Sequence, residues 1–191
     1  MEISYILQIV TISITLIFGI ITYLQTKQIQ HSQNIVSVTT NYRLTRSEQL
    51  KEAGVDLLTN TTPEILEMCR NPEEMLTKAT RAYEKIGIIM HRNFEADKLL
   101  ISLAENIRDA AFEYVKKGYQ QAEKIRLEYL QKVFRLRCDM YSSAEWNRVK
   151  RETVGRDTTS QSWIDYYGGI EKKFDAEIVE LRKEYGVKSE E

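Results

Sequence analysis

The stretch NPEEMLTKATRAYEKIGIIM at residues 71–90 contains the pattern that decides the fold. It opens with Asn, Pro and two Glu, an order typical of a helix start, because Asn caps and Pro suits the first helical position. Apolar side chains then recur at helical spacing, at Met75, Ala79, Tyr83, Ile86 and Met90. We therefore predict an amphipathic helix over this stretch.

The segments on either side repeat this pattern. Thr62-Pro63-Glu64 predicts a second helix start upstream. Downstream, apolar periodicity predicts helices over 95–117, about 119–141 and about 170–185, and Lys116-Lys117-Gly118 has the composition of a helix end. Ser142 and Ser143 are expected to cap a further short helix. The hydroxyl- and glycine-rich residues 153–169 are expected to form a loop.

Composition agrees with an all-α fold. The 191 residues include only 2 Pro and 8 Gly, too few for the many turns of an all-β domain. Cys69 and Cys138 are the two cysteines, and a single widely spaced pair gives neither a disulfide framework nor a zinc motif. The sequence thus predicts a bundle of five or six helices with reduced thiols.

A separate segment, SYILQIVTISITLIFGIITYL at residues 4–24, has no charged residue. As a helix it would be about 31 Å long, which matches a hydrocarbon core of about 30 Å. Tyr5 and Tyr23 stand near its ends, where aromatic rings favour the membrane interface. A cleaved signal peptide fits less well, because the segment lacks a basic start and a small-residue cleavage site. We expect a transmembrane helix from Tyr5 to Leu24.

Flanking charge predicts the orientation of this span. Glu2 alone precedes it, whereas Lys27, Arg43 and Arg46 follow before the next acid, Glu48. Positive flanks stay in the cytoplasm. We therefore expect a single-pass protein of the inner (plasma) membrane with a cytoplasmic C-terminal domain.

One stripe of the expected span is small or polar. Its members are Gln8, Thr11, Thr15, Gly19 and Thr22. Their spacing keeps them on one helical face, and small residues let two membrane helices approach while Gln hydrogen-bonds across the interface. The stripe predicts a homo-oligomer that associates through the span; the alternative is that its hydroxyls bond only to their own backbone.

The chain divides into three parts on this reading. Residues 1–24 are the anchor, residues 25–47 a juxtamembrane stalk or linker, and residues 48–191 the cytoplasmic helical domain. No Pro or Gly interrupts the chain between Gly19 and Gly54, so the anchor helix is expected to continue as a stalk. A flexible linker is the alternative.

A basic, aromatic segment is the candidate binding site. Residues 124–156 contain nine bases and four acids, although net charge is −1 over the whole chain. Arginines among aromatic residues suit an anionic ligand, either a nucleotide or an anionic lipid headgroup. The expected contacts are Arg135, Arg137, Arg148 and Arg151. Since Arg135 and Arg137 diverge by about 200°, at most one can face a given site, whereas Arg148 and Arg151 share a face. The competing interpretation is a solvated helix face, or pairing with Glu177, Glu180 and Glu184.

No catalytic or metal-binding motif is present. The chain has two histidines, and HExxH, CxxC, GxSxG, GxGxxG and P-loop patterns do not occur. We expect no catalytic residue, no metal and no cofactor, with an enzyme whose site is assembled from scattered residues as a remaining alternative.

The stretches RAYEKIGIIMHRNFEADKLLISLAENI at 81–107 and KIRLEYLQKVF at 124–134 resemble an uncharacterised family of small bacterial proteins. Its pattern has an aromatic-Glu-x-hydrophobic-Gly motif, here Tyr83, Glu84, Ile86 and Gly87, and then an acid-rich helix start. The resemblance implies one N-terminal span and a cytoplasmic helical domain, and no activity. In architecture the chain is also similar to membrane-anchored effectors of antiphage defence, including those gated by cyclic oligoadenylates.

The expected function is that of a membrane-anchored, non-enzymatic sensor or effector that self-associates through its span. Its expected partners are the lipid bilayer, a second copy of the chain and a nucleotide or anionic-lipid ligand. A membrane tether or scaffold for a cytoplasmic partner protein is the runner-up, because both roles need the same anchor and helical surface.

Overall fold

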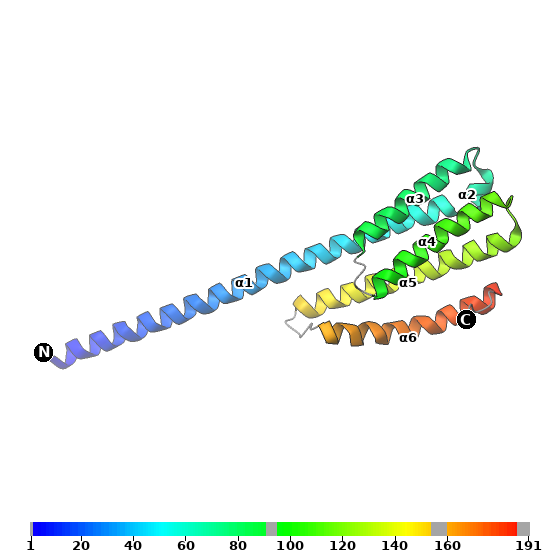
Figure 1. The fold of residues 1–191 in the computed structure, drawn as a ribbon. Helices are drawn as coiled ribbons and strands as arrows, with labels where there is room; N and C mark the ends of the chain where they lie inside the picture. The colour runs from blue at the N-terminus through cyan, green and yellow to red at the C-terminus, as the bar shows by residue number, and fades with distance from the viewer. Residues whose placement is uncertain (1, 91–94, 154–159, 187–191) are drawn as a thin grey trace. The chain divides into compact units, whose positions relative to one another are not determined.

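The computed structural model describes residues 2–90, 95–153 and 160–186 (Figure 1). Within these ranges, only the backbone is described for residues 2–15, 31, 32, 35, 152, 153, 160–167, 170 and 173. The chain divides into two compact units, Met1–Tyr42 and Arg43–Glu191, which we treat separately.

The fold is all-α, as the sequence predicts. The helices are α1 (Glu2–Thr61), α2 (Pro63–Met68), α3 (Pro72–Ile89), α4 (Glu95–Lys116), α5 (Gln121–Thr153) and α6 (Ser160–Tyr185). No strand occurs in the three described ranges. Pro63 and Pro72 each stand at the first position of a helix, as predicted, but neither Thr62 nor Asn71 makes a side-chain cap hydrogen bond.

Two boundary predictions are wrong. Ser142 and Ser143 do not begin a new helix, because α5 runs through them to Thr153. The Ser142 hydroxyl instead accepts a hydrogen bond from Ser47 of α1 at 3.3 Å. The loop expected over 153–169 is also too long, since α6 already begins at Ser160 and contains Gly168 and Gly169. Residues 154–159 lie outside the described ranges.

The first unit is the N-terminal part of α1. Residues 25–47, the expected stalk, lie entirely within this helix. Within the described side chains, we find no helix with both the length and the apolar character needed to cross a membrane. Gly19 and Thr22 of the expected polar stripe are exposed, and nothing lies within 4 Å of a Cβ built on Gly19. The side chains of Gln8, Thr11 and Thr15 lie outside the description.

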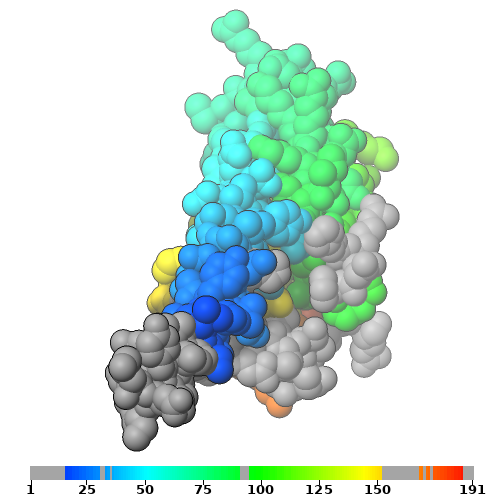
Figure 2. Space-filling model, turned by 90° about the vertical axis from the view of Figure 1, so that its left-hand side faces the viewer, coloured from blue at the N-terminus to red at the C-terminus, as the bar shows by residue number. Residues whose placement is uncertain are grey.

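The second unit is a helical bundle around one main core. The α3 helix packs on α4, α4 on α5 and α5 on α6. The C-terminal part of α1 enters the core through Leu50, Ala53 and Leu57, each fully buried. Figure 2 shows α3 (green) covering one side of this part of α1 (cyan). The core thus includes one face of a helix that begins in the other unit.

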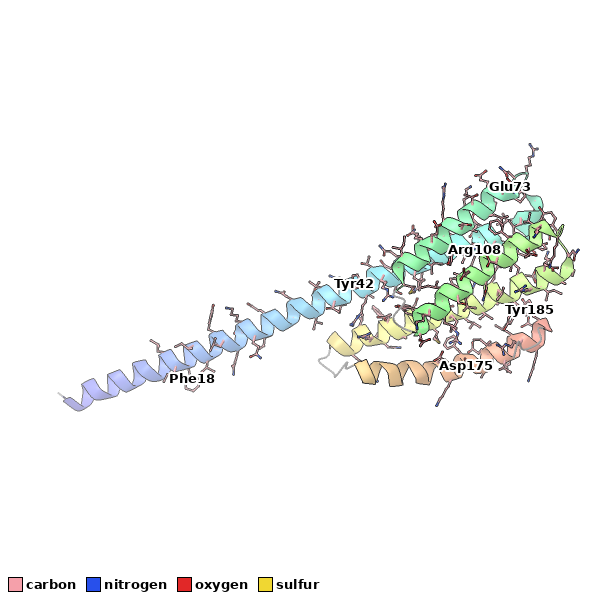
Figure 3. All side chains as sticks on the ribbon, viewed as in Figure 1. Phe18, Tyr42, Glu73, Arg108, Asp175 and Tyr185 are labelled. Atoms are coloured by element: carbon pink, nitrogen blue, oxygen red, sulfur yellow. The ribbon has the colours of Figure 1, made fainter. Side chains whose placement is uncertain are left out.

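The buried face of α3 is turned relative to the predicted one. Ala79, Ile86 and Met90 are buried as the periodicity predicts. Leu76 and Ala82 replace Met75 and Tyr83, which are only partly buried. Tyr83 instead lies under the guanidinium of Arg108 on α4, 4.5 Å from Cζ to the ring centroid; Arg108 is labelled in Figure 3. An aromatic ring can stay half-exposed when it offers its face to a cation.

The pairing of α1 with α5 has a fixed antiparallel register. At one end Gln131 Nε2 donates to Thr61 Oγ1 at 2.9 Å, and at the other Ser47 donates to Ser142. Between them Gly54 meets Phe134: a Cβ built on Gly54 would lie 3.3 Å from Phe134 Cε1. The absence of a side chain at Gly54 therefore lets the two helices approach closely.

The turn between α4 and α5 depends on two left-handed residues, Gly118 (φ 70°) and Tyr119 (φ 63°). Left-handed backbone is unfavourable for residues other than Gly, and the ring of Tyr119 packs edge-on against Tyr114 with 5.3 Å between centroids. The Tyr114 hydroxyl donates to Glu67 of α2. Burial, together with this carboxylate, raises the pKa of Tyr114 to about 12. The contact ties α2 to the end of α4.

We predict that Leu57→Ala lowers the free energy of unfolding by about 2–5 kcal/mol, because the substitution leaves a cavity at a fully buried position. Val55, two residues earlier on the same helix, is 61% exposed, and Val55→Ala should change it by less than about 0.5 kcal/mol. Urea denaturation followed by circular dichroism measures both. Equal effects of the two substitutions would contradict the assignment of the core face of α1.

Candidate functional site

A buried ion pair joins α1 to α4 where α1 enters the bundle. Arg46 Nη2 lies 2.6 Å from Asp97 Oδ2, and the two side chains are 13% and 2% exposed. The Arg46 Nε also donates to the carbonyl oxygen of Ile89 at 2.9 Å, and the guanidinium lies 5.8 Å from the ring centroid of Tyr141. Burial acts to lower the pKa of Arg46. Tyr141, Asp97 and Glu145 together raise this pKa by more than burial lowers it, so the pKa lies above its ordinary value. Arg46 is thus held charged by partners on three other elements.

A second buried carboxylate, Glu145 of α5, stands beside this pair. It is 7% exposed, and its Oε2 accepts no hydrogen bond from the described residues. The pKa of Glu145 is raised above its ordinary value, chiefly by burial and to a smaller extent by Asp97. The positive charges of Arg148, Arg43 and Arg46 act in the opposite direction. We call Arg46, Asp97 and Glu145 the buried charge cluster. Because Arg43 and Arg46 of α1 lower the pKa of Glu145, the protonation of Glu145 depends on how α1 packs there.

The four arginines expected to bind a ligand lie at separate points of α5. The first and last, Arg135 and Arg151, are 16 positions apart, which is about 24 Å along a helix. No single small ligand can therefore contact all four.

Arg137 is used by the fold itself. It is 8% exposed, and its Nη1 and Nη2 lie 3.1 Å from Glu171 Oε1 and 3.2 Å from Asp175 Oδ1 of α6. Asp175 is labelled on α6 in Figure 3. The competing interpretation, that the arginines pair with the acidic C-terminal helix, holds for Arg137. Its partners on α6 precede the expected acids, Glu177, Glu180 and Glu184.

Arg135, unlike Arg137, is exposed. It lines two grooves on the bundle. One, of about 490 Å³, lies between α1 and α5; the other, of about 600 Å³, lies between α5 and α6 and includes Glu177, Glu180 and Glu184. Arg135 is exposed and Arg137 is buried, and both lie beside α6.

Arg148 and Arg151 lie near the end of α5. Arg148 is half-buried beside Glu145, whose pKa it lowers, and Arg151 is exposed. Of the two arginines predicted to share a face, Arg148 therefore lies beside the buried charge cluster and Arg151 lies in solvent.

Sequence reasoning missed the buried charge cluster. From the sequence alone, Arg46 is a positive flank of the span, and Asp97 is an acid in the first turn of a helix. The sequence does contain a signal for Asp97. It lies three, four and seven positions before three apolar residues of α4, and this spacing puts it on their face of the helix. These residues, Leu100, Ile101 and Ala104, are all buried. An acid at such a position predicts a buried partner.

Among the described residues, no three His, Cys, Asp or Glu side chains come together in a group that could hold a metal ion. In comparisons with protein-family models, with curated proteins and with solved structures, nothing matches this chain. What the fold and the site define is therefore an all-α bundle with a buried charge cluster and two grooves along α5.

We predict that Asp97→Leu lowers the free energy of unfolding by about 3–5 kcal/mol, because it leaves the Arg46 charge buried without its nearest counter-charge. The double variant Arg46→Met, Asp97→Leu should recover much of the loss, since both charges are then gone. Chemical denaturation of the three proteins measures the coupling. A double variant less stable than Asp97→Leu alone would contradict a buried pair.

The raised pKa of Glu145 also predicts a pH dependence. Between the ordinary pKa and the raised one, the folded chain keeps a proton that the unfolded chain has lost. The stability that this group contributes is present at acid pH and is lost as pH rises through the folded pKa. Glu145→Gln remains neutral, so its melting temperature should rise relative to wild type as pH increases from 4 to 8. Glu180→Gln, on an exposed part of α6, is the matched control; an equal trend in both would contradict the assignment.

Proposed function

We propose that this chain is a membrane-anchored, non-enzymatic sensor or effector whose helical domain, residues 48–191, binds an anionic ligand and whose span associates with a second copy. The observation that supports it best is the exposed apolar surface of α1 at residues 16–24. Leu16, Ile17 and Phe18 are consecutive and 55–65% exposed. Consecutive helical residues point about 100° apart, so these three side chains span about 200° of the helix and leave only the narrow stripe of Gly19 and Thr22. Phe18 is labelled in Figure 3.

Such a surface needs an apolar environment. An exposed apolar patch on a water-soluble helix is normally one-sided and faces a partner, whereas a helix that is apolar all round is surrounded by lipid or by other helices. A span needs about 20 residues, and the uncharged segment supplies them only if it includes residues 5–15. Membrane anchoring by Tyr5–Leu24, with the domain in the cytoplasm of a bacterial cell, accounts for the whole segment.

The continuity of α1, which has residues in both units, supports the sensor role. Leu50, Ala53, Leu57 and Arg46 of the bundle belong to α1, the same helix that contains the apolar segment. A ligand that changes the packing of α1 in the bundle would act on the anchoring helix directly. Arg135, Arg148 and Arg151 are the candidate contacts for an anion, while Arg137 is held by α6. A tether for a cytoplasmic protein uses the same anchor and differs only in what the bundle binds.

The anchor is tested by cell fractionation with alkaline carbonate extraction. The full chain should remain in the membrane pellet. Leu16→Arg combined with Phe18→Arg should move it to the supernatant, because each Arg costs about 2.5–3.5 kcal/mol in the middle of a span. The matched control is Val38→Arg with Tyr42→Arg, which changes two exposed apolar residues of the same helix beyond the expected span and should leave the chain in the pellet. A wild-type chain extracted by carbonate overturns the proposal.

A further inference from the structure

The groove between α1 and α5 has an apolar floor. It is about 490 Å³ in volume, within the range of small-molecule sites. Its base is Gly54, Phe134 and Cys138, which are buried, and Val55 and Leu58 of α1 form one wall. The groove exists because Gly54 has no side chain: α1 and α5 approach closely there, and no Cβ fills the space above Phe134.

Two cations stand at the rim of this groove. Lys51 of α1 and Arg135 of α5 are exposed and line it, one from each wall. Within the described ranges, neither makes an ion pair or a side-chain hydrogen bond, although most other lysines and arginines of the bundle do. Asp139 is the one acidic lining residue, so the rim has a net positive charge.

Both cations lie within about one helical turn of Gly54, on opposite sides of its level because the two helices are antiparallel. Gly54 faces both Phe134 and Cys138, and Arg135 follows Phe134 directly. Lys51 precedes Gly54 by three residues, less than one helical turn, or about 4.5 Å along the axis. Both side chains are long and flexible, so one anionic group can meet both while its apolar remainder lies on the floor.

We propose that the groove between α1 and α5 binds an amphiphilic anion, a medium-chain alkyl carboxylate, with its carboxylate on Lys51 and Arg135 and its alkyl chain over Gly54 and Phe134. The proposal rests on the ligand-binding part of the proposed function and names its site. A nucleotide is disfavoured, because Gly54, Phe134 and Cys138 offer no strong donor or acceptor to a base edge. Since the ligand would contact α1 and α5 at once, occupancy strengthens the pairing of these helices.

The test is photolabelling of the full chain in phosphatidylcholine nanodiscs with dodecanoate that has a diazirine on its alkyl chain. Labelled peptides are mapped by mass spectrometry. Label is expected within residues 51–59 and 134–139, and excess plain dodecanoate should remove it while AMP should not. Because a hydrogen bond to a charged group contributes about 1.5–3 kcal/mol, Lys51→Gln with Arg135→Gln should reduce label there about tenfold or more. Lys172→Gln with Lys183→Gln removes the same charge from α6 and should not.

A second pair of variants tests the apolar part of the groove. Val55→Trp fills the groove from an exposed wall position and should abolish the label; Val179→Trp places the same ring on an exposed part of α6 and should keep it. Unchanged label in Val55→Trp, or competition by AMP, overturns the proposal. Label confined to residues 5–24 overturns it and leaves the membrane anchor supported. Label in the groove of a chain that carbonate extracts supports the groove and overturns the anchor.

Discussion

The close contact of Gly54 with Phe134 is the constraint on which the bundle depends. Leu50, Ala53 and Leu57 can reach the core only if the backbone of α1 lies close to α5. A methyl carbon at Gly54 would lie 3.3 Å from the Phe134 ring, so the ring would have to shift by a few tenths of an ångström in a closely packed core. The flanking hydrogen bonds, Gln131 to Thr61 and Ser47 to Ser142, have the correct length only in the register that this contact allows.

The same contact explains where the charges of the bundle lie. With α1 held against α5, Arg46 is placed between α4 and α5, where solvent is excluded and Asp97 becomes its partner. A buried pair of this kind contributes little net stability, because desolvation offsets most of the attraction. Its effect is on specificity: an α1 displaced by one turn would leave both charges buried and unpaired. Register is therefore enforced by packing at Gly54 and by charge at Arg46.

The sequence predicted the helices and not their faces. Pro63, Pro72 and Gly118 mark helix boundaries through backbone geometry, which is local, and those boundaries agree with the structure. Ser142 failed as a boundary because its hydroxyl bonds to a residue 95 positions away. Helix geometry alone predicts that Arg135 and Arg137 point in different directions. The burial of Arg137 depends on Glu171 and Asp175, which belong to α6. Partners that are distant in the chain cannot be read from local patterns, and the charge cluster and the groove are both made of such partners.

The two thiols give the bundle an internal reporter of access from solvent. Burial raises the pKa of Cys138 to about 12, so at neutral pH almost none of it is the reactive thiolate. Cys69, at the corner between α2 and α3, is only partly buried. A thiol reagent should therefore modify Cys69 readily and Cys138 slowly. A ligand that fills the groove above Cys138 should slow the second reaction further, so the rate at which the second thiol reacts reports on access to the groove between α1 and α5.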